Sequence, residues 1–380
     1  MSDSTELDHS ALTTPDHVVS AARGLLLPHL RKLVGRVPAP LHDPCAYYFG
    51  WVDEAGREVV YRGPSFRAVT LVLLSAGVEG GSWHRAQPVA GACALIHGYG
   101  LICDDVIDKD GTRRGFPTVW KTFGVSTAVL AADALLMTAL AELAEQTGPA
   151  AADVRRVLFG AMYGAFRAQA LDARHQQQAG VCLRQALEVV DGKSSDWVAA
   201  CCEAGALQGG AGPERVALMR SFGWHLGRVM QLRDDVLDLY GQAGQDSPPR
   251  RDDLRSRKKT SIVCAALESG HALRDELASY YQRPHAPQDG ELGRMADLVE
   301  QCGGRAWAER EIAHHLRQAR SRVRRAVKDR RTAELMCAYA DQFTRQSVGD
   351  EPVEPSRAGR PASPRPRPER ARTRRPPGST

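Results

Sequence analysis

The 380-residue sequence lacks several features that would assign a protein to a class at once. No apolar run reaches the roughly 18 residues that a membrane-spanning helix needs without a polar interruption, so we expect no membrane span. Residues 1–10 are acidic and polar, the opposite of a secretory signal. The nine cysteines include no CxxC pair and no metal-ligand spacing. Together these absences predict a cytoplasmic protein with reduced thiols.

A strong charge imbalance is also lacking. The net charge is only +5, and most of it comes from the segment after Gly349, where eight arginines outnumber four acidic residues. The rest of the chain is nearly neutral, so we expect no binding to nucleic acid. The same segment, 349–380, has no aromatic residue and is rich in Pro, Arg, Ser and Glu, which predicts disorder. A solvated appendage is the simplest interpretation, and a docking segment for an acidic protein partner is the alternative.

The alternation of apolar and polar residues that is typical of strands is absent as well. Apolar residues instead recur at helical spacing in one segment after another, which predicts an all-α protein. We expect one large single-domain helical bundle over residues 16–348, with its polar site inside and a disordered stretch at 1–15 before it. Residues 38–62 are expected to be irregular, Gly192–Ser194 to interrupt a helix, and Pro213 to begin one.

The sequence does contain one acidic motif, DDxxD, in two copies. The copies are Asp104, Asp105 and Asp108, and Asp234, Asp235 and Asp238. Each lies at the end of an apolar helical segment. Residues four apart share a helix face, so Asp104 and Asp108 lie together and Asp105 is turned aside. Negative charges at a helix C-terminus repel one another and the helix dipole, so they require a cation nearby. We interpret the two motifs as facing sides of one metal site.

Basic residues near the acidic motifs indicate what such a metal would bind. Mg²⁺ prefers oxygen ligands and commonly bridges carboxylates to phosphate oxygens. Arg113 and Arg114 follow the first motif and can bind phosphate oxygens bidentately. Lys193 lies in the expected helix break, and Lys258 and Lys259 follow the second motif. The pattern predicts a diphosphate held by Mg²⁺, with the apolar group that it carries inside the bundle.

With these motifs the sequence resembles the trans-isoprenyl diphosphate synthases, the polyprenyl synthetase family, over about residues 47–347. The first DDxxD is followed by RRGFPT, and the second is preceded by Gln231. Lys193-Ser194 is similar to the family's Lys-Thr pair, and the run DLRSRKKT at 253–260 is similar to its late lysine motif. The run YFGW at 48–51 resembles an actinobacterial branch that makes geranylgeranyl diphosphate.

The resemblance implies a fold, an activity and a set of site residues. The fold would be the all-helical isoprenoid synthase bundle with a central active-site cavity, normally a homodimer. The activity would be condensation of isopentenyl diphosphate with an allylic diphosphate, through Mg²⁺-assisted ionisation, to give geranylgeranyl or farnesyl diphosphate. The six aspartates of the two motifs would hold three Mg²⁺ ions. The allylic diphosphate would be bound by Arg113, Lys193, Ser194, Gln231 and Lys258. The residues implied to be catalytic are Asp104, Asp108, Asp234 and Lys193.

The site for isopentenyl diphosphate departs from the family's pattern. The family uses a GGKxxRP motif, a histidine and the second arginine of RRG, and Arg67, His97 and Arg114 match three of these positions. Pro64 stands where the family has lysine, and Arg62 is the candidate substitute. One lost charged contact costs about 2–3 kcal/mol, which would raise a Michaelis constant without abolishing the reaction. His97 has a simpler interpretation too, as an ordinary core histidine.

Two other functions stay open at this point. A terpene synthase on the same fold would ionise a prenyl diphosphate without isopentenyl diphosphate. Pro64 favours that alternative, and the retained Arg67, His97 and Arg114 oppose it. A non-catalytic partner subunit is the second alternative, although an inert subunit would have no use for two intact acidic motifs.

Product length depends on the residues just before the first acidic motif. The resemblance places Tyr99 at the floor of the elongation pocket, between the small Gly98 and Gly100. One aromatic stopper with small neighbours is similar to C20 synthases, with C15 synthases a close second. The alternative is that Tyr99 is simply part of the core.

Overall fold

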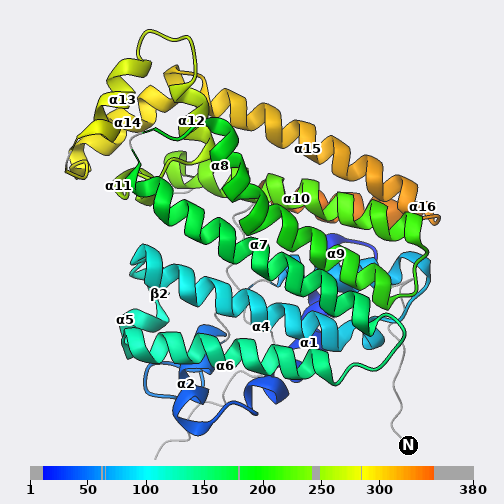
Figure 1. Ribbon diagram of the computed structural model, residues 1–380. Coiled ribbons are helices and arrows are strands. Elements are labelled where there is room, and N and C mark those ends of the chain that lie inside the picture. The colour runs from blue at the N-terminus through cyan, green and yellow to red at the C-terminus, as the bar shows by residue number, and fades with distance from the viewer. Residues whose placement is uncertain are drawn as a thin grey trace, which may run out of the picture.

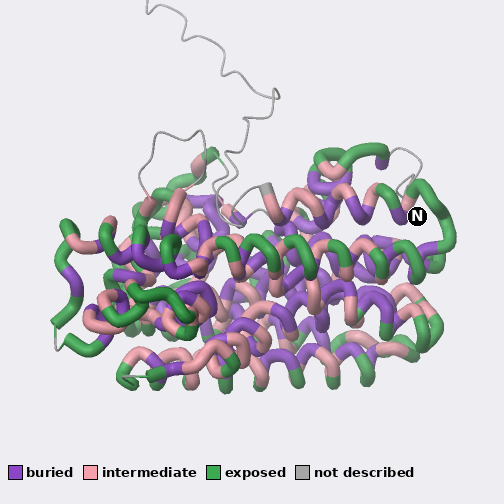
Figure 2. Tube along the Cα trace, turned by 90° about the horizontal axis from the view of Figure 1, so that it is seen from above, coloured by how far each residue is buried: buried purple, intermediate pink, exposed green. Residues whose placement is uncertain are grey.

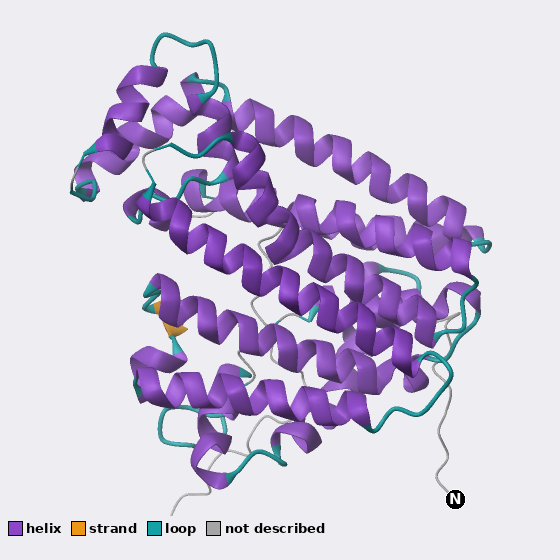
Figure 3. Cartoon of the chain, viewed as in Figure 1, coloured by secondary structure: helices purple, strands orange, loops and turns teal. Residues whose placement is uncertain are grey.

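The computed structural model describes residues 12–60, 63–64, 66–178, 180–241, 249–283 and 285–345, and these residues are largely helical (Figures 1 and 3). The first helices are α1 (Pro15–Val34), α2 (Ala39–Tyr48), α3 (Arg67–Ala76), α4 (Trp83–Asp108), α5 (Val119–Phe123), α6 (Val125–Ala144), α7 (Ala151–Gln177) and α8 (Leu183–Val190). The later helices are α9 (Asp196–Gln208), α10 (Pro213–Tyr240), α11 (Asp252–Arg255), α12 (Ser261–Leu267), α13 (Arg274–Gln282), α14 (Asp289–Gln301), α15 (Gly304–Ala326) and α16 (Arg330–Arg345). The all-α prediction is confirmed.

Three short elements complete the fold. A 3₁₀ turn, Gly77–Glu79, follows α3, and a π-helical turn, Asp191–Ser195, joins α8 to α9 at the interruption that the sequence predicts. Strands β1 (Thr112–Arg113) and β2 (Phe116–Pro117) form a small antiparallel hairpin after α4, with Arg113 opposite Phe116. Most of the predicted disordered segments, residues 1–11 and 349–380, lie outside the described residues.

Local sequence signals determine where several helices begin and end. The Thr14 hydroxyl accepts a hydrogen bond from the His17 amide at 3.2 Å and caps α1, whose first residue is Pro15. Pro213 begins α10, as predicted. Gly241, at a φ of 70°, ends that helix in a conformation that glycine adopts without strain.

The expectation of irregular structure over residues 38–62 is wrong in its first part, where α2 forms. Pro40 lies in the first turn of α2, where no amide hydrogen is required. Pro44 lies further in and removes one backbone hydrogen bond. Cys45 compensates because it is fully buried, and its thiol donates to the Ala131 carbonyl of α6 at 3.5 Å. Packing against α6 therefore outweighs the low helix propensity of proline.

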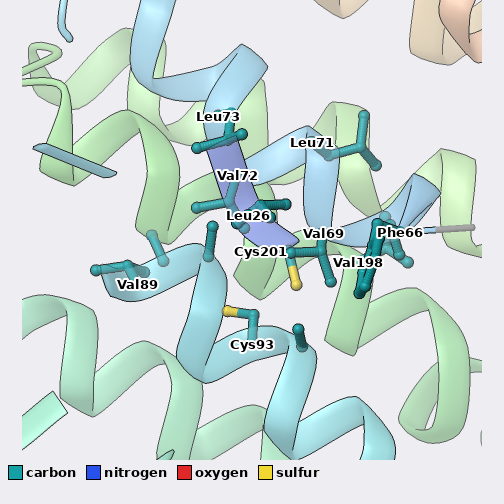
Figure 4. Close-up of a cluster of buried hydrophobic side chains, with 14 of the residues drawn as sticks. Leu26, Phe66, Val69, Leu71, Val72, Leu73, Val89, Cys93, Val198 and Cys201 are labelled. Atoms are coloured by element: carbon teal, nitrogen blue, oxygen red, sulfur yellow. The ribbon is translucent and has the colours of Figure 1, made fainter. Parts of the chain in front are cut away.

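Helix α3 lies within the main hydrophobic core. Every residue of α3 is buried, and Leu26 of α1 and Val89 of α4 lie around it (Figure 4). Helix α9 approaches α3 closely because Gly205 and Gly209 face it. A Cβ atom at either glycine would collide with a backbone carbonyl of α3. Figure 2 shows the resulting buried interior beneath the exposed outer faces of the helices.

The C-terminal ends of α4, α7 and α10 lie at the same end of the bundle (Figure 1). Because one DDxxD motif ends α4 and the other lies near the end of α10, both motifs lie at this end of the bundle. A second, smaller hydrophobic cluster combines α12, α13 and α14 with the last turns of α10. The second acidic motif therefore borders this cluster, because Val236 lies between its aspartates and Leu239 follows them.

Two described helices, α4 and α6, are long and apolar enough to cross a membrane, by length and composition only. In their most apolar windows, 56% of the α4 residues and 39% of the α6 residues are buried inside the protein. Helix α4 packs against α3, α6 and α9, as the core helix of a folded domain does. The expectation of no membrane span stays a prediction. The nine cysteines are free, and seven of them are buried.

Candidate functional site

The first acidic motif lies in the last turns of α4. Asp105 is only 2% exposed and binds Arg113, whose Nε donates at 2.8 Å and whose Nη2 lies 2.6 Å from the same carboxylate oxygen. The sequence predicts Arg113 at a phosphate, whereas here its guanidinium neutralises Asp105. Asp104 and Asp108 lie on another face of α4, and each approaches a lysine. The predicted division of the motif into a pair and a third residue turned aside is present.

The second acidic motif is held by hydrogen bonds within α10 and to its neighbours. Gln231 Nε2 donates to Asp235 at 2.8 Å, and Gln231 Oε1 accepts from Ser194 Oγ at 2.6 Å. Asp238 accepts from the first two amides of α11, each at 3.1 Å, and so caps that helix. Asp234 is partly exposed. Asp235 and Asp238 therefore make protein contacts in this structure.

Lys193 connects the first motif to α7. Its ammonium lies 3.6 Å from Asp104 Oδ2 and 3.4 Å from Asp172 Oδ2. The sequence interpretation missed Asp172, because a single acid within a long helical segment has no motif around it. Its position near the C-terminal end of α7, the end shared with both acidic motifs, is visible only in the fold.

Lys258 makes the corresponding contact on the other side. Its Nζ donates to Asp108 Oδ2 at 2.7 Å and lies 3.5 Å from Asp253 Oδ1. Burial opposes the ammonium charge, but the carboxylates of Asp253 and Asp108 outweigh burial and raise the pKa of Lys258. Asp253 is also a site residue that the sequence interpretation missed, although it begins the run DLRSRKKT.

Burial dominates the electrostatics of the acidic residues. It raises the pKa of Asp104, while the charge of Lys193 opposes the rise. Burial and the charge of Asp253 together raise the pKa of Asp235, and they raise that of Asp238 to about 7. Buried carboxylates whose charged form is disfavoured gain most from an added cation.

The donor set therefore fits a hard divalent cation. All the candidate ligands are carboxylate oxygens, which Mg²⁺ prefers. Within the ranges that the structure describes, no three carboxylate, imidazole or thiol groups converge closely enough to hold a metal as they stand. Lys193 and Lys258 instead supply positive charge beside the first motif.

The residues predicted for a second diphosphate are Arg67 at the start of α3, His97 within α4 and Arg114 just after β1. Arg67 begins α3 and is 1% exposed, and its carbonyl accepts from Tyr339 Oη at 2.8 Å. Burial, with the charges of Arg114 and Arg113, lowers the pKa of His97 to about 4, so its ring is neutral near pH 7. Arg62, the candidate substitute for the missing lysine, lies outside the described residues.

Arg114 is oriented by Tyr48. Its guanidinium lies 5.3 Å from the centre of the Tyr48 ring, and its Nη1 donates to the Tyr48 carbonyl at 3.4 Å. Arg113 and Arg114 line a pocket together with Tyr47, Tyr48 and Phe116. Both arginines of RRG therefore line one pocket, and their charges act on His97.

Tyr99 lies on α4 and contacts α7. Its ring packs edge-on against Phe166, with the ring centres 5.8 Å apart. Gly98 has a different role from the one that the sequence suggests. A Cβ atom there would lie 2.9 Å from Tyr48 Cε1, so Gly98 makes room for Tyr48. Gly98 therefore leaves space for Tyr48, which lines the pocket with Arg113 and Arg114.

Comparison with known proteins agrees with this arrangement. The family model described as Polyprenyl synthetase matches residues 50–298, which is more than half of the chain. The chain belongs to the polyprenyl synthetase family. The predicted resemblance is confirmed, and the matched region contains both acidic motifs, both lysines and the arginine pair.

Relatives and solved structures in this family cover most of the chain. The (2E,6E)-farnesyl diphosphate synthase of Mycobacterium tuberculosis is 34% identical over 322 residues, which is 84% of this chain and 90% of that protein. The geranylgeranyl diphosphate synthase of the same organism is 34% identical over 77% of this chain and 84% of its own length. A polyprenyl synthetase of Streptomyces coelicolor A3(2) has a similar crystal structure, with a TM-score of 0.79 at 30% identity, covering 86% of this chain and 99% of that one.

Proposed function

We propose that this polyprenyl synthetase is a short-chain trans-prenyltransferase, which condenses isopentenyl diphosphate with an allylic diphosphate. The observation that carries the proposal is that both DDxxD motifs lie at the same end of the bundle, with Lys193 and Lys258 beside the first of them. The mycobacterial relatives, which are named as farnesyl and geranylgeranyl diphosphate synthases, support it. Nothing in these relatives favours a terpene synthase or a non-catalytic subunit.

The acidic motifs would hold Mg²⁺, which would bind the substrate diphosphate and stabilise it as a leaving group. The residues proposed to hold the metal are the six aspartates of the two motifs, Asp104, Asp105, Asp108, Asp234, Asp235 and Asp238. Lys193 and Lys258, now paired with carboxylates, carry the charge that phosphate oxygens require. Gln231 and Ser194 complete the polar lining on that side. His97 and Arg114 would receive the second diphosphate, together with Arg67.

A homodimer is part of the proposal. Helices α6 and α7, which follow each other in the chain, expose large apolar side chains, although a soluble monomer rarely exposes a large continuous apolar patch. These side chains are Val129, Leu130, Met137, Tyr163 and Phe166. Cytoplasmic localisation and a protein partner for residues 349–380 stay predictions.

Incubation with each substrate tests the proposed activity. The purified protein is incubated with Mg²⁺ and farnesyl diphosphate, with and without isopentenyl diphosphate, and the products are analysed by mass. We expect an elongated prenyl diphosphate only when isopentenyl diphosphate is present. A hydrocarbon or alcohol formed without isopentenyl diphosphate would indicate a terpene synthase. No product from farnesyl, geranyl or dimethylallyl diphosphate would indicate a non-catalytic subunit.

We expect Tyr99→Ala to lengthen the products. The contact between Tyr99 and Phe166 closes the space between α4 and α7, and removing one ring opens it for a growing chain. Wild-type products should be C20 or C15, and the variant should give products at least one C5 unit longer by mass analysis. Tyr163→Ala is a matched control, because this ring also contacts Phe166 but is 74% exposed. An unchanged product distribution for Tyr99→Ala would identify Tyr99 as a core residue only.

A further inference from the structure

The π-helical turn Asp191–Ser195 determines where Lys193 and Ser194 point. A π turn contains one residue more than an α-helical turn, and each added residue rotates the following side chains by about 100° around the helix. Lys193 is directed from this turn to Asp104 on α4, and Ser194 to Gln231 on α10. A regular helix here would turn at least one of these side chains away. Because π turns are intrinsically rare, surrounding contacts must stabilise this one.

Close packing on two sides confines the backbone of the turn. A Cβ atom at Gly192 would lie 2.7 Å from the Ala168 Cβ of α7. On the other side, a Cβ atom at Gly227 of α10 would lie 2.6 Å from the Ser194 carbonyl oxygen. The turn is therefore held between α7 and α10 at distances that larger residues would not allow. Packing alone, however, does not fix where the turn begins.

The first residue of the turn is fixed by an ion pair with α10. Arg228 donates to Asp191 twice, from Nε to Oδ1 and from Nη2 to Oδ2, each at 2.9 Å. The guanidinium also lies over the Trp224 ring, 4.8 Å from its centre, and the Arg228 side chain is only 12% exposed. Two parallel hydrogen bonds to a carboxylate define direction as well as distance.

One face of α10 thus binds both parts of the turn. Arg228 and Gln231 are three residues apart and lie on the same face. Arg228 binds the first residue of the turn, and Gln231 binds Ser194 near its end. One turn further along α10, Asp235 accepts from Gln231. A continuous row of contacts therefore joins the ion pair to the second acidic motif.

We infer that Arg228 is a positioning residue. Through Asp191 it holds the π-helical turn in register, and it thereby directs Lys193 and Ser194 to the allylic diphosphate. The inference rests on the proposed function, because it assigns Lys193 and Ser194 to that substrate. Arg228 itself does not need to touch either substrate.

Kinetics of Arg228→Met test this assignment in the full-length protein, after wild-type prenyltransferase activity has been measured. We expect kcat/KM for the allylic diphosphate to fall about 10- to 100-fold, because small displacements of binding groups have effects of this size. The KM for isopentenyl diphosphate should change less than about twofold, because its proposed residues lie on α3, on α4 and in the turn after β1. Arg228→Lys keeps the charge without the paired geometry, so its kcat/KM for the allylic diphosphate should lie between those of the wild type and Arg228→Met.

Arg220→Met is the matched control. Arg220 also lies on α10 and pairs with an acid across the same interface, Glu203 of α9, at 3.6 Å. The Arg220 side chain is 65% exposed and pairs with Glu203 outside the π turn. The kinetic constants of Arg220→Met should therefore equal those of the wild type. Equal losses in Arg228→Met and Arg220→Met would overturn the inference.

A double-mutant cycle separates positioning from general stability. In a Lys193→Ala/Ser194→Ala background, adding Arg228→Met should lower kcat/KM for the allylic diphosphate by less than about threefold, because the side chains that Arg228 positions are gone. An undiminished loss in that background would overturn the inference. If Arg228→Met does not fold, Asp191→Asn breaks the same ion pair without changing the shape, and the same cycle applies. An inactive wild-type protein would refute the proposed function instead.

Discussion

Replacing Asp104 with asparagine is expected to lower kcat at least about 1,000-fold. The carboxylate lies on the face of α4 that meets Lys193, and it is proposed to hold Mg²⁺ together with Asp108. Metal stabilisation of a leaving diphosphate contributes several kcal/mol, and each 1.4 kcal/mol corresponds to about a factor of ten in rate. Steady-state kinetics at saturating substrates, with a Mg²⁺ titration, measure the effect.

The same substitution should leave the fold intact. Burial raises the pKa of Asp104, which means that the charged form is costly in the folded protein. Asparagine removes that cost, so the melting temperature without Mg²⁺ should stay equal or rise. Asp153→Asn, on an exposed turn of α7 with Arg156 beside it, is the control and should change neither quantity. A kcat for Asp104→Asn within tenfold of the wild type would contradict the metal assignment.

The fold class and the position of the acidic motifs could be predicted from the sequence for physical reasons. The 3.6-residue period is a local property, and it shows directly in the apolar segments that form α4 and α10. Three aspartates at the end of an apolar helix are costly unless a cation compensates, so the spacing of Asp104 and Asp108 by itself indicates a site. The interruption at Gly192–Ser194 is likewise predictable from the local sequence.

Other parts of the site depend on tertiary contacts that no local pattern reports. Helix α2 contains Pro44 and forms because Cys45 packs against α6. Asp172 is isolated in the sequence, and only the packing of α7 brings it to Lys193. Asp238 belongs to a metal-binding motif by spacing, yet here it caps α11. The roles of these residues follow from how the helices lie beside one another, which the sequence does not report.

Replacing Lys258 with methionine is expected to reduce both stability and activity. Lys258 lies between Asp108 and Asp253, and its side chain is 17% exposed. Removing one partner from such a buried ion pair leaves the carboxylates without compensation and costs about 3–5 kcal/mol of unfolding free energy. The loss should be larger at pH 8 than at pH 5, because at low pH the carboxyl groups can take up protons instead. Denaturant unfolding at the two pH values measures it.

A second substitution separates the structural role of Lys258 from its role at the substrate. In Lys258→Met/Asp253→Asn one of the uncompensated charges is gone, so most of the lost stability should return. The kcat/KM for the allylic diphosphate should stay at least about 100-fold below the wild type, since a phosphate still lacks its cation. Lys258→Arg keeps the charge, so it should retain stability whether Lys258 acts only on the aspartates or also on the substrate. Recovery of activity together with stability in the double variant would show that Lys258 serves only to neutralise the aspartates.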